Sequence, residues 1–290
     1  IGFSHISNWQ AGIIPLLNLF IGSFFFFCLI GFGRFLMKAL RIEIYEPWDL
    51  VCRLILGIFS LSLINQIIAI FNSANNVTYS ILFIFFTIFG VCELKNIQIM
   101  RIKFEKINLI PLIILSLIFI SRFLLAIIPS TKMDELYYHM LFPSRIISDN
   151  ALNYYHFPWE SAIWPHMHYQ FISTPFYSLG FPESVNIITI SVFITFVYIA
   201  SFLVYKSTQN INLSLWCAVL ISSGLHSTVD LITNASTSLL ILSAGTSLII
   251  LSKPAEYLPS SNLKSFSIFF SLLFIGIIGS KISMAPIAIL

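Results

Sequence analysis

Eight runs of mainly apolar residues constrain this chain more than any other feature of its sequence. A transmembrane helix needs about 20 such residues to cross the hydrocarbon core of a bilayer. The runs lie near residues 11–33, 50–71, 78–93, 108–128, 184–205, 213–228, 236–252 and 266–290. Charged residues make up only 9% of the chain, against about 25% in soluble proteins. The sequence therefore predicts an all-α, multi-pass membrane protein with about eight transmembrane helices.

The basic residues predict which side of the membrane each connection faces. The connections after the first, third, fifth and seventh runs hold or adjoin Arg34, Lys38, Arg41, Arg53, Lys95, Arg101, Lys103, Lys106, Lys206, Lys253 and Lys264. The other connections hold only Lys132 and Arg145, both in one long loop. Because Lys and Arg accumulate in cytoplasmic loops, we expect the N-terminus, the turns near 72–78 and 225–236, and the long loop to lie on the extracytoplasmic side.

These spans divide the chain into three parts. Residues 1–129 hold the first four transmembrane helices, residues 130–183 form the extracytoplasmic loop, and residues 184–290 hold the last four helices. The chain begins at Ile1 and ends inside an apolar run at Leu290, so we expect an N-terminal fragment of a longer protein. The first connection, residues 34–49, suits either an amphipathic segment at the headgroups or a solvated charged turn.

Composition also argues against some partners. No basic face or stripe is present for a nucleic-acid backbone to follow, so we do not expect nucleic acid as a partner. The four cysteines fall in or beside apolar runs without the CxxC spacing of many metal and redox sites, and we interpret them as small apolar side chains. They are Cys28, Cys52, Cys92 and Cys217.

The long loop opens with a segment that predicts an interfacial helix. From Met133 to Ile147 the apolar side chains fall on one side at helical spacing, as in a helix lying in the membrane interface. Ser130 or Thr131 can cap this helix, and Pro143 is expected to kink or end its first part.

Two acids and a histidine stand at the front of this predicted helix. Glu135 and His139 are one turn apart and can share a proton or a ligand. Asp134 precedes them near the membrane surface among aromatic residues, which suits a general base acting on an acceptor hydroxyl. The same acids equally suit the first turn of any helix, where negative charge is favoured. The spacing alone leaves both interpretations open.

The second half of the loop is rich in aromatic and imidazole groups. Its tyrosines and tryptophans suit either platforms for sugar rings or an aromatic belt at the interface. His166 and His168 are separated by one residue, and together with His139 and His156 they suit substrate contacts or a divalent cation. No fixed ligand spacing such as HExxH supports a metal, so we predict no defined metal site.

Two basic residues lie inside apolar runs. Arg122 is in the fourth run, about two turns before the loop, and Lys281 is in the eighth. Intramembrane cations usually face a cavity or a partner. Lys281 is predicted to lie towards the face that carries Asp134, where it suits the phosphate of a lipid-anchored donor. Snorkelling of its side chain to the interface is the alternative.

The loop resembles a known family. The pattern Pro129-x4-Asp134-x-Leu136-x-Tyr138-His139, followed by an aromatic and proline-rich stretch, is similar to the first outer loop of bacterial GT-C-type membrane glycosyltransferases. Gly279-Ser280-Lys281 followed by Ala285-Pro286 resembles a Gly-Thr-Lys segment in a later span of the same proteins. The resemblance covers roughly residues 108–290, and it departs at Glu135, where relatives usually have a small residue.

The resemblance implies a function and roles for individual residues. It implies transfer of a sugar from a polyprenyl-phosphate donor to an extracytoplasmic acceptor in the cell envelope, in the inner membrane of a bacterium. Asp134 would be the catalytic base and Glu135 a second acid. The substrate-binding residues expected from the loop and the eighth run are Tyr138, His139, Arg145, His166, His168 and Lys281.

Two further functions remain open from the sequence. A transporter or flippase would use Arg122 and Lys281 to line its path, although transporters tend to bind their substrates at the midplane of the membrane. A non-catalytic membrane scaffold would use the loop only to bind a partner.

Overall fold

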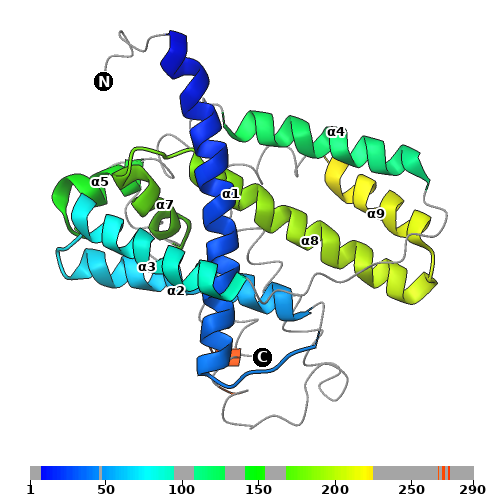
Figure 1. Ribbon diagram of the computed structural model, residues 1–290, viewed down its shortest axis with the longest axis horizontal. Helices are drawn as coiled ribbons and strands as arrows, with labels where there is room; N and C mark the ends of the chain where they lie inside the picture. The colour runs from blue at the N-terminus through cyan, green and yellow to red at the C-terminus, as the bar shows by residue number, and fades with distance from the viewer. Residues whose placement is uncertain are drawn as a thin grey trace.

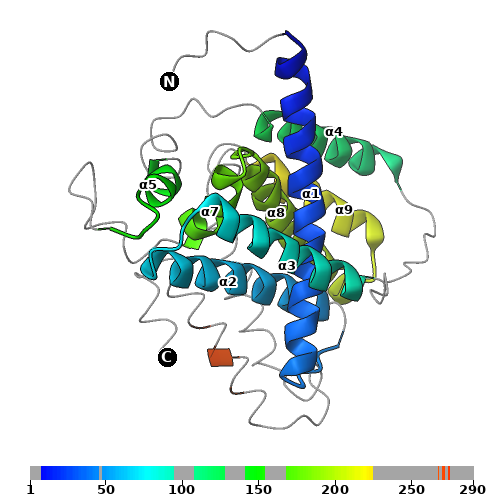
Figure 2. The ribbon, with the colours of Figure 1, turned by 60° about the vertical axis from the view of Figure 1, so that its left-hand side comes forward.

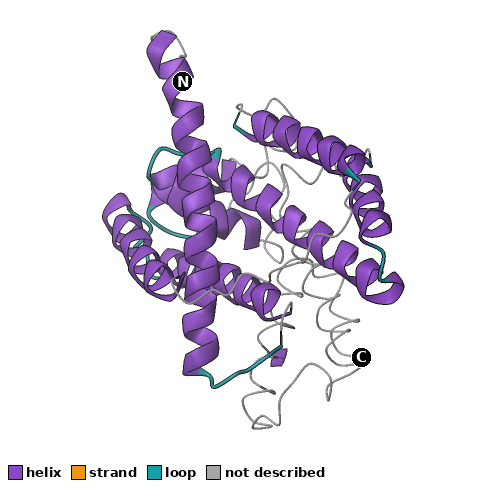
Figure 3. Ribbon diagram, turned by 45° about the vertical axis from the view of Figure 1, so that its right-hand side comes forward, coloured by secondary structure: helices purple, strands orange, loops and turns teal. Residues whose placement is uncertain are grey.

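The apolar runs fold into helices wherever the structure describes them. The computed structural model describes residues 8–45, 48–94, 108–127, 141–153 and 168–224, with Ser267, Phe270, Ser271 and Phe274. Regular structure in these ranges is entirely helical, and they contain no strand (Figure 3). The helices are α1 (Asn8–Ala39), α2 (Trp48–Ile70), α3 (Asn76–Leu94), α4 (Leu109–Ala126), α5 (Leu141–Asp149), α7 (His168–Ser178), α8 (Ser184–Thr208) and α9 (Ile211–Ser223).

Five of these helices are long and apolar enough to cross a membrane. They are α1, α2, α3, α4 and α8. Their large outward-facing side chains are apolar, for example Leu117 on α4 and Ile81 on α3, as lipid contact requires. The chain is therefore an integral, multi-pass α-helical membrane protein. The predicted run 236–252 lies outside the described residues, and only four described residues of 266–290 are helical.

The sixth predicted span differs from the structure. Its helix, α9, has 13 residues and ends at Ser223, whereas the apolar run extends to residue 228. A helix of this length rises about 20 Å, which is less than the roughly 30 Å of a bilayer core.

Helix α1 packs against α2, α3 and α8. In Figures 1 and 2 it stands upright while α2 and α3 run across it, and α4, α8 and α9 lie on its other side. Glycines permit these crossings. A Cβ at Gly33 would overlap the backbone of Arg53 on α2, and one at Gly31 would overlap Gly90 on α3. A Cβ at Gly22 would lie 2.5 Å from the Ser184 carbonyl at the start of α8. Small residues that let helix backbones meet are a common basis of packing in membranes.

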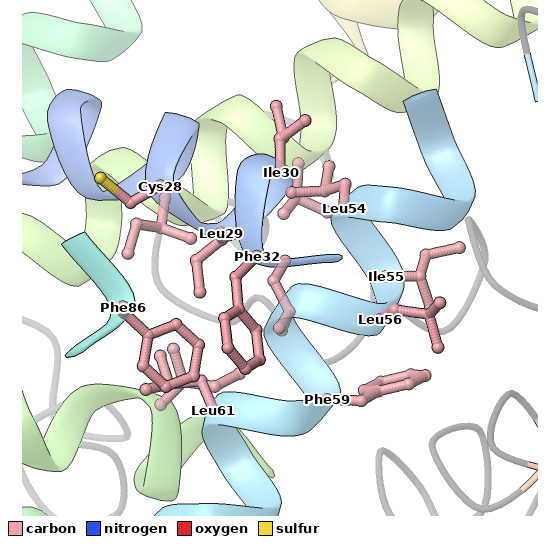
Figure 4. Packing of buried hydrophobic residues seen from close by; sticks show 14 of the residues in the cluster. Cys28, Leu29, Ile30, Phe32, Leu54, Ile55, Leu56, Phe59, Leu61 and Phe86 are labelled. Carbon is pink, nitrogen blue, oxygen red and sulfur yellow. The ribbon is translucent and has the colours of Figure 1, made fainter. Parts of the chain in front are cut away.

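Aromatic side chains fill the space around these crossings. The rings of Phe32 on α1 and Phe86 on α3 are 4.3 Å apart between centroids, and those of Phe25 and Phe83 are 4.4 Å apart. Figure 4 shows Phe32 and Phe86 beside Leu29 in this core, with side chains from α2 nearby. The core continues into α5 and α7 through buried Phe142 and Phe176.

The described part of the first connection is not a fully solvated turn, and the placement of residues 34–49 as an amphipathic segment at the headgroups stays a prediction. Helix α1 continues to Ala39, and residues 42–45 are not helical. In this segment buried Ile42 and Ile44 alternate with exposed Glu43 and Tyr45. The alternation has the period of two that an extended backbone produces, and it turns the apolar side chains onto the core.

Hydrogen bonds and ion pairs sort the helix ends into two groups. One group joins the end of α2, the start of α3, α5, α7 and the start of α8, and we call it the loop end (Figure 1). The opposite end contains the ion pairs of Glu93 on α3 with Arg34 (3.4 Å) and Lys38 (2.5 Å) on α1. At the start of α4, the backbone N–H of Asn108 donates to the Asn212 side chain of α9 at 2.8 Å. The sidedness expected from the basic residues, including which end faces the cytoplasm, stays a prediction.

Candidate functional site

Most of the predicted site residues lie outside the described residues. Asp134, Glu135, Tyr138 and His139 fall in 128–140, His166 falls in 154–167, and Lys281 falls in 275–290. Arg145 is described on α5, and His168 is the first residue of α7. The structure therefore describes the helices on both sides of the central loop segment, and the site is built up from these flanks.

Helix α5 confirms the C-terminal part of the helix predicted for Met133–Ile147. It runs from Leu141 to Asp149, so it extends two residues further than predicted. The kink or helix end expected at Pro143 concerns the segment before Leu141, which lies outside the described residues. Phe142 and Ile146 are buried, while Ser148 and Asp149 are exposed. Arg145 is half-buried between these two faces.

The chain after α5 is fixed to the turn between α2 and α3. The backbone N–H of Ala74 donates to the Asn150 carbonyl at 3.0 Å, and the N–H of Leu152 donates to the Ala69 carbonyl at 2.9 Å. Asn150 has φ of 54°, a left-handed conformation that asparagine adopts more easily than most residues. These two bonds hold the exit of α5 against the loop end.

Helix α7 docks at the same end through its own contacts. It packs against α2, α3, α5 and α8. Asn65 of α2 donates its side-chain N–H to the Phe171 carbonyl at 2.6 Å, and the Ser178 hydroxyl donates to the Asn76 side chain at 2.7 Å. Both described flanks of the loop are therefore seated on the helices of the bundle.

A carboxylate and an amide link the end of the loop to α1. Glu183 immediately precedes α8, where negative charge suits the helix N-terminus. Its Oε2 accepts a hydrogen bond of 3.0 Å from the side-chain amide of Asn18, and the Ser184 hydroxyl donates to Asn18 Oδ1 at 3.0 Å. Asn18 is buried in α1, so each half of its side chain has a polar partner.

Arg122 has protein partners within the membrane-spanning part, as predicted for an intramembrane cation. It is 2% exposed, and its guanidinium donates to the Ser222 carbonyl near the end of α9. Its Cζ lies 5.1 Å from the centre of the Phe193 ring of α8, within cation–π range. Nearby, the Asn186 side chain donates to the Ala126 carbonyl at 3.4 Å. Arg122 thus joins α4, α8 and α9 on the side where α4 runs towards the loop.

The described ranges contain no group of three or more His, Cys, Asp or Glu residues positioned to hold a metal. The cysteines are free, with Cys28 and Cys52 buried, which agrees with their interpretation as small apolar side chains. The histidines considered as metal ligands, His139, His156 and His166, are outside the described residues.

Several polar residues that organise this end were not identified from the sequence. Asn18, Asn65, Gln170 and Asn186 are all buried. Their signal was an isolated amide within an apolar stretch, as in Leu17-Asn18-Leu19. An amide in such a place needs a hydrogen-bond partner, but its partner is not visible in the sequence.

Comparisons of the chain with protein-family models, with curated proteins and with solved structures found no match in any of the three.

Proposed function

We propose that this protein is a membrane glycosyltransferase of the GT-C type, which moves a sugar from a polyprenyl-phosphate donor to an acceptor in the cell envelope. The observation that carries the proposal is the composition of residues 128–167, which gather four acids, three histidines and many aromatic residues around helix α5 and just before helix α7, both of which are docked on the bundle. We place the protein in the inner membrane of a bacterium, with the N-terminus and the loop on the extracytoplasmic side.

The docking of both flanks supports an enzyme more than a loosely held binding loop. Helix α5 and its exit are bonded to the turn between α2 and α3, and α7 is bonded to α2 and α3. Catalytic groups gain from being held by rigid elements, because the reacting geometry is then set before the substrate binds.

In the proposed reaction the acceptor hydroxyl oxygen attacks the anomeric carbon of the sugar. The bond from that carbon to the phosphate oxygen breaks, and the polyprenyl phosphate leaves with the electron pair. Asp134 takes the proton of the attacking hydroxyl, and Glu135 is a second acid beside it. Lys281 neutralises the phosphate, while Tyr138, His139, Arg145, His166 and His168 contact substrate. A divalent cation at the donor phosphate is compatible with this scheme.

Arg122 does not favour the transporter alternative. A cation that lines a transport path faces water or substrate, whereas Arg122 is buried against the Ser222 carbonyl and the Phe193 ring. We therefore assign it to helix packing and not to the substrate path.

The test separates binding from turnover with three variants and a polyprenyl-phosphate sugar as donor. Lys281→Ala is expected to weaken donor binding by about 1.5–3 kcal/mol, because it removes a charge-assisted contact. Asp134→Asn is expected to leave binding nearly intact and to abolish transfer, as for a base that acts mainly in the transition state. Asp149→Asn, the same change at the exposed end of α5, is the matched control and should transfer normally.

Transfer that survives Asp134→Asn would refute the assigned base. Donor flux across proteoliposomes without any transfer would favour a flippase. Binding of neither donor nor acceptor by a normally assembled protein would favour the scaffold.

A further inference from the structure

Helix α7 contains a proline that opens its hydrogen-bond ladder. Pro175 is the eighth residue of this 11-residue helix. In an α-helix the N–H of each residue donates to the carbonyl four positions earlier, and proline has no N–H. The carbonyl that Pro175 leaves without its helical donor is that of Phe171. Phe171 is itself buried, so water does not replace the lost donor.

Asn65 supplies the missing donor from another helix. Its Nδ2 lies 2.6 Å from the Phe171 carbonyl oxygen, across a separation of 106 residues in the chain. A carbonyl can only accept, so the amide nitrogen and not the oxygen must face it. Asn65 is fully buried in α2, and a buried carbonyl left unpaired there would be costly. The Asn65 side chain of α2 thus supplies the hydrogen-bond donor that a backbone N–H at position 175 of α7 would otherwise supply.

Two buried hydroxyl groups of α7 do not need this help. The hydroxyls of Ser173 and Thr174 both donate to the Gln170 carbonyl, at 2.9 and 2.7 Å. They are satisfied within their own helix and make α7 neither more nor less dependent on α2. The bond from Asn65 is directed at the one turn that the proline interrupts.

The opened turn also divides α7 into two halves with different surroundings. The half after Pro175 is tied to α3 by the bond from Ser178 to Asn76. The half before it begins at His168, three residues ahead of Phe171, and continues the histidine-containing end of the loop. A turn that lacks an internal hydrogen bond is where a helix kinks, so a contact at this turn sets the direction of the first half.

We propose that Asn65 is a positioning residue: by donating to the Phe171 carbonyl it sets the direction of the first half of α7, the half that begins at His168, relative to substrate. The link to substrate rests on the proposed glycosyl transfer, whereas the pairing of Asn65 with the proline-opened turn does not. The inference predicts that Asn65 is needed only because residue 175 is proline.

The test is a double-mutant cycle on full-length protein in lipid nanodiscs, with Asn65→Leu, Pro175→Ala and the two combined. Backbone hydrogen exchange of α7 is the physical readout, and KM and kcat for a polyprenyl-phosphate sugar are the functional readout. Alanine at 175 restores an N–H to the Phe171 carbonyl. Asn65→Leu alone is expected to speed exchange in α7 by about tenfold, because a buried carbonyl loses its donor. In the Pro175→Ala background, Asn65→Leu is expected to change the exchange rate of α7 by less than twofold.

For the functional readout, Asn65→Leu should raise the donor KM severalfold with kcat nearly unchanged, and Pro175→Ala should restore the KM. Pro111→Ala is the matched control, because Pro111 lies in the first turn of α4, directly after the Asn108 cap, and frees no carbonyl of that helix. It should not rescue Asn65→Leu.

If Asn65→Leu speeds hydrogen exchange of α7 equally in the wild type and in Pro175→Ala, the proposed pairing of Asn65 with the turn at Pro175 is overturned. Asn65 would then be a packing residue. If Asn65→Leu does not fold, a folded double variant supports the pairing, and a double variant that also fails overturns it. Coupled exchange with an unchanged KM would overturn the positioning role. Coupled exchange without sugar transfer by the wild type would instead count against the proposed function while supporting the pairing.

Discussion

The helices on the two sides of α1 are held together by different kinds of interaction. On the side of α2 and α3, backbones touch at glycines and phenylalanine rings fill the remaining space. On the side of α4, α8 and α9, the helices are joined by buried polar groups, including Arg122 and the Ser214 hydroxyl, which donates to the Ser201 carbonyl of α8 at 2.7 Å. Lipid tails are as apolar as leucine, so burying apolar side chains gains little in a membrane. Close packing and hydrogen bonds are the two alternatives: glycine crossings join α1 to α2, α3 and the start of α8, whereas buried polar contacts join α4, α8 and α9.

The largest expected effect comes from breaking the glycine-packed side. Gly33→Leu places a side chain against the backbone of Arg53, and backbone cannot move aside as a flexible side chain can. We expect it to lower the free energy of unfolding by about 3 kcal/mol, at the upper end for overpacking. Unfolding in mixed micelles is the measurement. Gly12→Leu is the matched control, because nothing lies within 4 Å of a Cβ at Gly12; equal losses for the two variants would contradict the role assigned to the crossing.

The next largest loss of stability is expected from breaking the polar contacts among α4, α8 and α9. Arg122→Met keeps the length and apolar stem of the side chain but leaves the Ser222 carbonyl without the guanidinium donor. We expect a loss of about 2 kcal/mol, from an unsatisfied buried carbonyl together with the lost contact to the Phe193 ring. Lys206→Met, at the exposed end of α8, should cost less than about 0.5 kcal/mol. If Arg122→Met is more stable than the wild type, the free energy of desolvating the guanidinium exceeds the stabilisation from its contacts.

A smaller loss of stability is expected for the contact between α1 and the start of α8. Asn18→Leu removes the bonds of α1 to Glu183 and Ser184. Single interhelical hydrogen bonds in membranes contribute about 0.6 kcal/mol on average, so we expect a loss of about 1 kcal/mol for the pair. Ser60→Ala is the control, because the Ser60 hydroxyl bonds only within its own helix, to the Leu56 carbonyl. A cost of 3 kcal/mol or more would show that this joint is as important as the glycine crossings.

The smallest effect is expected at the end opposite the loop. Lys38→Gln removes the cation that pairs with Glu93 and leaves the pair of Glu93 with Arg34 in place. Half of the Lys38 side chain is exposed, and solvent-exposed ion pairs contribute about 0.5 kcal/mol or less. The loss should shrink further when unfolding is measured at high salt, because exposed pairs are screened. A loss that does not depend on salt would show that Lys38 acts through packing and not through charge.

Much of the fold was predictable because apolar length is easily seen. The run 108–128 corresponds to Leu109–Ala126, and 50–71 corresponds to Trp48–Ile70. The first run was placed at 11–33 but α1 continues to Ala39, because charge ends an apolar run without ending a helix. Arg34 and Lys38 lie on the last turns of α1 and pair with Glu93. The polarity of the residues therefore located the membrane-embedded part but not the end of the helix.

The site was less predictable than the fold. The acids, histidines and lysine assigned to it were chosen by type and spacing, and most of them stay predictions. Arg145 and His168 were assigned from the loop alone, and the structure describes them on α5 and α7, two helices that pack against each other. The kink or helix end expected at Pro143 stays a prediction, because the residues before Leu141 lie outside the described residues.

The sequence by itself determined that this chain is helical and crosses a membrane several times, because a backbone in lipid must satisfy its polar groups within the segment. The distribution of Lys and Arg also predicts which connections share a side, and that sidedness stays a prediction. Only the tertiary structure decided which residues meet. Gly33 faces the backbone of Arg53, and Asn65 faces the carbonyl that Pro175 leaves open. Pairing over such sequence distances depends on how helices cross, and crossing is set by the shapes of whole helix surfaces, which no local pattern records.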